Sequence, residues 1–337
     1  MITPQAQRVT GKRRAARVAQ LVDNSWVAFG LRRTGRFLAS IVVLITAAFL
    51  LIHLVPGDPV RAALGPSAPL DLVEARREAL GLNNPLHIQF FEYVTGLFRG
   101  DLGTSITSGL PVADVIAERL SATAVIAGLA FVVAILIAAP VGLGIAILTR
   151  GQRRGSLDAG FTWMSVLVGA IPEFLVGIGL VAVFAVTLGW FPVAGRSGPE
   201  SYILPVIALA IGPAAIIARI LRVEALAVMN ADFVRTTRAK RLRPRLIHLR
   251  HVLPNTLTAT LTVAGLLLGG MAVGTVLVES IFAWPGLGSR LVQSIISMDY
   301  PVVQALVLVY GAGILLINLV VDVLLAWMDP RSTMKEV

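Results

Sequence analysis

Six long apolar runs, separated by polar segments, dominate the pattern of hydrophobic and polar positions along the chain. Each is about as long as the ~20 residues that a helix needs to cross the hydrocarbon core of a bilayer. Backbone groups in lipid have no water to bond, so runs of this length are expected to be helices. The pattern therefore predicts an all-α integral membrane protein with six transmembrane helices. The runs are about Phe37–Val55, Thr123–Leu148, Phe161–Leu188, Tyr202–Leu221, Thr258–Phe282 and Val303–Trp327.

Composition agrees with a membrane protein and excludes several kinds of chemistry. Of 337 residues, 56% are hydrophobic and only 14% are charged, too few to cover a soluble protein of this size. The chain has no cysteine, which excludes disulfides and thiolate nucleophiles. It has no G-x-x-x-x-G-K-[ST] loop for ATP, and no nucleophile–base pair is visible. The four histidines are too far apart in the chain to form one metal shell, so we expect no catalytic residue, bound cofactor or metal here.

The net charge of +10 could indicate nucleic-acid binding, but the distribution of the basic residues along the chain favours another explanation. If the N- and C-termini are cytoplasmic, six crossings place 22 of the 29 Lys and Arg residues on the cytoplasmic side. The opposite orientation would reverse this ratio. The positive-inside rule therefore predicts cytoplasmic termini, and we expect membrane lipid, not nucleic acid, around this chain.

The polar segments divide the chain into four parts. Residues 1–35 form a basic cytoplasmic extension, for which an interfacial amphipathic helix is favoured over a frayed tail. Residues 36–122 hold the first span and a large extracytoplasmic loop with a predicted helix at Leu70–Leu80, closed by Gly81. Residues 123–330 form a core of five helices, and residues 331–337 form a cytoplasmic tail.

A dense basic segment, "DFVRTTRAKRLRPRLIHLRHVLPNTL" at 232–257, lies between two apolar spans. Glu224–Lys240 has helical composition, with Leu226, Met229, Phe233 and Thr237 along one stripe. A break follows, and Pro244 suits the first turn of a second helix that ends near Pro254. A helix, a turn and a helix that project from two spans predict a docking element.

This segment resembles the cytoplasmic coupling loop of ABC-transporter permeases of the peptide/nickel importer family. That loop typically reads D-Y-V-R-T-A-R-A-K-G-L followed by R-H-x-L-x-N. Other stretches are similar to the same family in the same order, over roughly residues 36–331. They are "LIHLVPGDPV", "LGLNNPLHIQFFEYV", "GDLGTS", "VESIFAWPGLGSRLVQSIISMDYPVVQA" and "INLVVDVLLAWMDPR".

The resemblance implies the type I ABC importer permease architecture in the bacterial cytoplasmic (inner) membrane. It also implies a second homologous permease subunit, one or two cytoplasmic ATPase subunits that carry ATP and Mg²⁺, and an extracytoplasmic substrate-binding protein. The loop 222–257 would then dock on the ATPase subunits. The residues that match or flank the motif are Asp232, Phe233, Arg235, Thr236, Thr237, Ala239, Lys240, Arg241, Leu246 and His251.

Three positions in the loop depart from the family pattern. Arg241 stands in place of a glycine, where a left-handed turn would cost a side chain roughly 1 kcal/mol or more. Thr237 replaces an alanine, and Arg243 replaces the serine that usually caps the second helix. These departures concern the geometry of the turn and the choice of ATPase subunit.

Polar residues inside the spans are candidates for the translocation path, because a carboxylate in a membrane usually faces a cavity or a partner. Glu173 follows Pro172 in the third span and would either contact substrate or sit at a solvated helix kink. Glu279 and Asn318 have the same two interpretations, and a structural role is favoured for both. Asp322, near the inner end of the sixth span, is expected to bond to a neighbouring helix.

The leading interpretation is a pore-forming subunit without enzymatic activity of its own. Members of the family that it resembles most often carry di- or oligopeptides, so these are the expected cargo. Nickel, glutathione and other small solutes are alternative cargoes. A stand-alone secondary transporter would need its own coupling-ion site or an internal repeat, and neither is visible. A membrane-embedded enzyme would need paired catalytic residues in adjacent spans.

Overall fold

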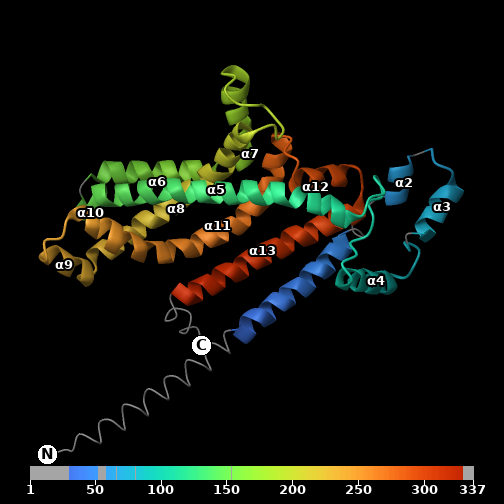
Figure 1. The fold of residues 1–337 in the computed structure, drawn as a ribbon, viewed down its shortest axis with the longest axis horizontal. Coiled ribbons are helices and arrows are strands. Elements are labelled where there is room, and N and C mark those ends of the chain that lie inside the picture. The colour runs from blue at the N-terminus through green and yellow to red at the C-terminus, as the bar shows by residue number, and fades with distance from the viewer. Residues whose placement is uncertain (1–29, 52–57, 66, 80, 153, 329–337) are drawn as a thin grey trace, which may run out of the picture.

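The computed structural model describes residues 30–51, 58–65, 67–79, 81–152 and 154–328 (Figure 1). Within these residues the chain forms helices joined by turns, with one isolated β-bridge between Thr104 and Pro111. The residues of the predicted interfacial helix in the extension 1–35 lie outside the described residues, as does the tail 331–337.

Five helices are long and apolar enough to cross a membrane, by length and composition. A bent pair of helices makes a sixth if the two are counted as one span, which agrees with the six predicted spans over the residues that the structure describes. The uninterrupted helices are the N-terminal span Gly30–Leu51, α5 (Val112–Thr149), α8 (Ile203–Asn230), α11 (Leu253–Ile281) and α13 (Tyr300–Met328).

The third span is not one continuous helix over Phe161–Leu188, as the apolar run predicted. It consists of α6 (Gly155–Ala170) and α7 (Glu173–Leu180), which continues as the π-helical η2 (Val181–Thr187), and the two parts are bent by 89°. Ile171, before Pro172, has extended backbone angles of φ −75° and ψ 122°. Proline disfavours the helical region for the residue before it, which explains the break.

The helices α5 and α8 form the centre of the bundle, and α11 lies beside them (Figure 1). α5 has 38 residues, so it is about 57 Å long at 1.5 Å per residue and extends beyond the hydrocarbon core. Gly142 permits the close approach of α5 to α8, because a Cβ there would lie 2.5 Å from the carbonyl oxygen of Ala218.

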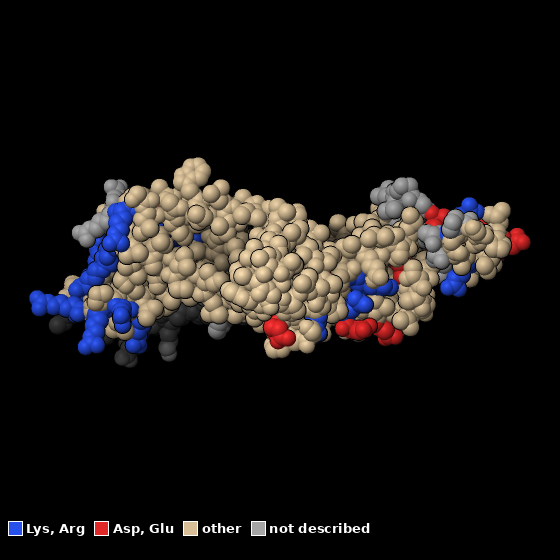
Figure 2. All heavy atoms as spheres, turned by 90° about the horizontal axis from the view of Figure 1, so that it is seen from above, with Lys and Arg blue, Asp and Glu red and all other residues tan. Residues whose placement is uncertain are grey.

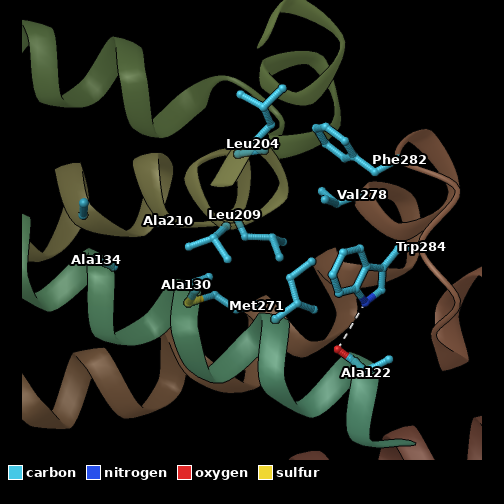
Figure 3. Packing of buried hydrophobic residues seen from close by; sticks show 14 of the residues in the cluster. Ala122, Ala130, Ala134, Leu204, Leu209, Ala210, Met271, Val278, Phe282 and Trp284 are labelled. Atoms are coloured by element: carbon cyan, nitrogen blue, oxygen red, sulfur yellow. Dashed lines mark hydrogen bonds between the residues drawn. The ribbon is translucent and has the colours of Figure 1, made fainter. Parts of the chain in front are cut away.

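The largest buried cluster joins α5, α8 and α11 around Trp284 (Figure 3). The Trp284 side chain is fully buried, and its Nε1–H donates a 3.2 Å hydrogen bond to the carbonyl oxygen of Ala122. Leu209 of α8 and Met271 of α11 point into the same cluster (Figure 3). A buried tryptophan with a satisfied N–H contributes a large apolar area without an unpaired donor.

Short helices lie at the end of the bundle away from the connection between α8 and α11. They belong to the large loop that was predicted between the first two spans. They are α2 (Pro59–Leu64), α3 (Leu70–Ala79) and α4 (Leu86–Phe98) (Figure 1). The predicted helix at 70–80 is confirmed over residues 70–79, and Gly81 has a φ of 66°. α12 (Leu287–Ile296) and the 3₁₀ turn η3 (Pro199–Tyr202) complete the connections near this end.

Charge divides the two ends of the molecule. Figure 2 shows Lys and Arg gathered at the end that carries the connection after α8, and mixed acidic and basic residues at the end of α2, α3 and α4. Between the two ends most of this face is uncharged, apart from a few charged side chains along its lower edge. The distribution agrees with the cytoplasmic assignment of the basic end.

Candidate functional site

The basic segment forms a helical hairpin at the end of the bundle (Figure 1). α9 (Asp232–Ala239) is followed by a tight turn and then by α10 (Pro244–Ile247). The chain continues through the π-helical η4 (His248–Val252) directly into α11. We call residues 231–252 the coupling hairpin.

Two boundaries predicted for this segment are wrong. The predicted helix over Glu224–Lys240 breaks at Ala231, whose ψ of 151° ends α8 and begins α9. The second helix does not end near Pro254, because η4 carries it into the fifth span. A proline has no N–H and its ring crowds the preceding turn, and the wider π turn before Pro254 accommodates both effects.

The turn of the hairpin has the strain that the sequence indicated. Arg241 adopts φ 55°, in the left-handed region that favours glycine, and its N–H donates a 2.8 Å hydrogen bond to the carbonyl of Arg238. Pro244 occupies the start of α10, as predicted, and the Arg243 side chain makes no capping hydrogen bond.

The underside of the hairpin is anchored to the bundle by apolar side chains. Val234, Ile247 and Val252 are buried against Met229 at the end of α8. Burial of a Val or Ile side chain contributes about 1.5–3 kcal/mol, so three of them hold the hairpin firmly to the ends of its spans. The sequence interpretation missed Val234 as an anchor.

The predicted docking stripe is therefore divided between two faces. Met229 is fully buried, whereas Phe233 is 44% exposed and Leu246 is 42% exposed. The break at Ala231 rotates α9 relative to α8, so a stripe counted across it loses register. Phe233 of α9, Leu246 of α10 and Leu249 of η4 remain as exposed large apolar side chains of the hairpin.

The other candidate residues lie on the same hairpin. Asp232 and Arg235 form a 3.5 Å ion pair at the surface, with side chains 95% and 73% exposed, so it contributes little to stability. The hydroxyls of Thr236 and Thr237 donate to the carbonyls of Asp232 and Val234. Ala239, Lys240 and Arg241 are exposed residues, and His251 is half-buried.

His248 is the first residue of η4 and is half-buried. Burial, and after it the positive charge of Arg238, lower the pKa of the His248 imidazole below its ordinary value. The neutral form of this histidine is therefore favoured in the folded hairpin.

Glu173 lies at the break in the third span and lines a cleft of about 210 Å³. Residues of α6, α7, α8 and α11 form its walls. Glu279, by contrast, is fully buried, and it accepts hydrogen bonds from Thr123 Oγ1 at 2.7 Å and from the N–H of Gly288 at 2.7 Å. These bonds favour the structural interpretation of Glu279.

Two polar residues of α13, Asn318 and Asp322, contact neighbouring helices. Asn318 Oδ1 lies against Gly269 of α11, 3.6 Å from the position that a Cβ there would take. Asp322 forms a 2.7 Å ion pair with Arg33 of the N-terminal span, a partner that the sequence did not identify. Asp322 is thus structural, as expected.

Two further polar contacts escaped the sequence interpretation. Asp299 is fully buried and accepts hydrogen bonds from Ser105, Ile106 and Thr107, which fixes the "GDLGTS" turn to the segment after α12. Arg222 of α8 forms an ion pair with Asp158 of α6. In both cases the partners are far apart in the sequence, and only the fold brings them together.

Comparisons with known proteins agree with this architecture. Residues 138–334 match the family described as binding-protein-dependent transport system inner membrane component, and residues 26–127 match its N-terminal region. The chain is 37% identical over 305 residues to the glutathione transport system permease protein GsiC of Salmonella choleraesuis, covering 90% of this chain and 98% of that protein. It is 38% identical over 301 residues to GsiC of Escherichia coli K12, covering 89% and 95%.

A solved structure shares the fold. A chain of the MetNI methionine ABC transporter, in an inward-facing conformation, has a TM-score of 0.55 over 64% of this chain and 96% of its own length. Its sequence is only 18% identical, so this likeness concerns the fold alone. The multi-pass helical fold and the two family matches together show that the chain belongs to the binding-protein-dependent inner membrane components, the ABC importer permeases of the peptide/nickel family.

Proposed function

We propose that this chain forms one half of the pore of an ATP-driven importer for short peptides, with glutathione among its substrates. The coupling hairpin is the observation that carries the proposal of ATP coupling. It presents three exposed apolar side chains, Phe233, Leu246 and Leu249, among basic residues, on a base of buried valine and isoleucine.

Such a hairpin suits the transmission of force. Its buried underside ties it to α8 and α11 at once, so a push on its outer face moves both helices as rigid bodies. Phe233 and Leu246 would enter an apolar groove of an ATPase subunit, and the arginines around them would face acidic groups or anionic lipid headgroups. ATP and Mg²⁺ would be bound by the ATPase subunits and not by this chain.

The substrate class is supported by the relatives. Proteins 37% to 38% identical to this chain over nearly their whole length are named as glutathione transport permeases. Glutathione is a tripeptide, and it therefore lies within the peptide class that the sequence resemblance implies. The complete importer would add a second permease subunit and an extracytoplasmic binding protein that delivers the peptide.

The experiment is purification of the tagged chain from its native membranes, followed by reconstitution of the complex in proteoliposomes. We expect ATPase subunits and a second permease to co-purify, and uptake of radiolabelled glutathione to require ATP and the binding protein. A chain that purifies alone, or uptake that proceeds without ATP, would contradict the proposal. Uptake of dialanine or triglycine but not glutathione would keep the peptide class and exclude glutathione.

A further inference from the structure

The cleft at the break in the third span has one charged group in an apolar wall. Glu173 is the only ionisable side chain among the described residues that line it. Most of the wall comes from apolar side chains of α8 and α11, and Gly169, Gly212 and Gly270 leave parts of it without any side chain. A substrate group that entered the cleft would therefore meet a single carboxylate.

The Glu173 carboxylate has no partner within the part of the chain that the structure describes: no hydrogen bond or ion pair reaches it. The buried acids Glu279 and Asp299 differ in this respect, because several donors satisfy each of them. An unpaired carboxylate within a membrane span is costly, so such residues usually mark substrate or ion pathways. Glu173 is the first residue of α7, at the positive end of the helix dipole.

Space for this side chain depends on a glycine of another helix. A Cβ on Gly274 of α11 would collide with Glu173 Oε1. Any larger residue at position 274 would push the carboxylate out of its place beside α11. The break after Ile171 and the glycine at 274 thus act together to place a charge at the cleft.

The size of the cleft decides what it can hold. Sites that enclose whole small ligands have volumes of about 300–1,000 Å³, so 210 Å³ suits one end of a peptide and not the whole molecule. A peptide with a free amino terminus carries an ammonium group there at neutral pH, which complements a carboxylate. We propose that Glu173 is a cation subsite on the translocation path, which receives the ammonium group of the passing peptide. This inference rests on the proposed function.

The test measures peptide uptake by the reconstituted complex in which this chain carries Glu173→Gln. Glu118→Gln, at an exposed residue of α5, is the matched control. The probes are glutathione, dialanine and triglycine, each free and N-acetylated. Neutralising one member of a desolvated charge pair should lower uptake of the free peptides by about tenfold or more. Uptake of the acetylated peptides should be the same in the variant as in the wild type, and the control variant should behave as the wild type throughout.

A second variant separates position from charge. Gly274→Ala keeps the carboxylate but displaces it, and it should reproduce the selective loss for free peptides. Assembly with the ATPase subunits and hydrolysis stimulated by the loaded binding protein should persist in both variants, which excludes misfolding as the cause.

Three outcomes overturn the inference. Unchanged uptake of free peptides by the Glu173→Gln complex shows that no cation is recognised there. Equal losses for free and acetylated peptides show that Glu173 has a structural role. If the wild-type complex takes up none of the three peptides, the proposed peptide import is wrong, and the cation subsite at Glu173 is then wrong as well.

Discussion

Glu279 of α11 and Thr123 of α5 are joined by a 2.7 Å hydrogen bond, in which the threonine hydroxyl donates to Oε1 of the carboxylate. The same hydroxyl accepts a 2.8 Å hydrogen bond from the N–H of Leu287 at the start of α12. Glu279 also accepts from the N–H groups of Gly288 and Ser289. One threonine and one glutamate thus join two spans and α12 at a buried point.

Replacement of Thr123 by valine should therefore destabilise the folded chain. The change leaves the Leu287 N–H without its acceptor and removes one donor from Glu279, and each buried unsatisfied group costs about 1–3 kcal/mol. Thr123→Ser keeps the hydroxyl and should lose much less. The measurement is the thermal unfolding midpoint of the purified complex in detergent. Equal midpoints for the valine and serine variants would show that the hydroxyl is not needed.

Substitutions on the exposed and the buried face of the coupling hairpin should have opposite effects: one should weaken ATPase binding and the other the stability of the fold. Phe233→Ala combined with Leu246→Ala removes side chains that are 44% and 42% exposed, so the unfolding midpoint of the isolated chain should hardly change. Binding of the ATPase subunits should be lost. Val234→Ala, at a fully buried position, should instead lower stability by about 2 kcal/mol. Pull-down of ATPase subunits that is undiminished in the double variant would remove Phe233 and Leu246 from the docking surface.

The turn at Arg241 provides a test of backbone strain. Arg241→Gly should stabilise the hairpin by about 1 kcal/mol, because glycine adopts φ 55° without a steric cost. Arg241→Ala is the control, since it removes the same charge but keeps a Cβ and so gains nothing. Unfolding midpoints check the strain, and ATPase pull-down checks the charge. Weak pull-down by both variants would mean that the Arg241 guanidinium itself contacts the ATPase. Equal unfolding midpoints for the glycine and alanine variants would show that the backbone at position 241 is not strained.

The sequence was most informative where a local pattern determines the structure. Apolar runs long enough to span a bilayer identified the five continuous spans, and proline and glycine signals placed the start of α10 and the end of α3. The left-handed turn at Arg241 was implied by the family resemblance, because the family has a glycine at this position. Each of these features depends on a few neighbouring residues or on length alone.

The sequence was least informative where distant residues meet. Glu173 and Glu279 look alike in sequence, each a single acid in an apolar run, yet one has no partner among the described residues and the other has three donors. The divided stripe on the hairpin has a similar cause, because the break at Ala231 changes which face each residue takes. No periodicity reveals such a break, since Ala231 is an ordinary helix-forming residue.

His248 should make the stability of the coupling hairpin depend on pH. Burial and the charge of Arg238 lower the pKa of its imidazole in the folded state, so the unfolded chain binds more protons between that lowered pKa and about 6.5. Stability from this group is complete above pH 6.5 and decreases as the pH falls through the window. The unfolding midpoint of the wild type should therefore drop more between pH 7.5 and 5.5 than that of His248→Gln, which cannot be protonated. Arg238→Gln should reduce the drop in part, because it removes the second cause and leaves burial. A pH dependence that is the same in all three proteins would show that His248 does not titrate differently in the folded and unfolded states.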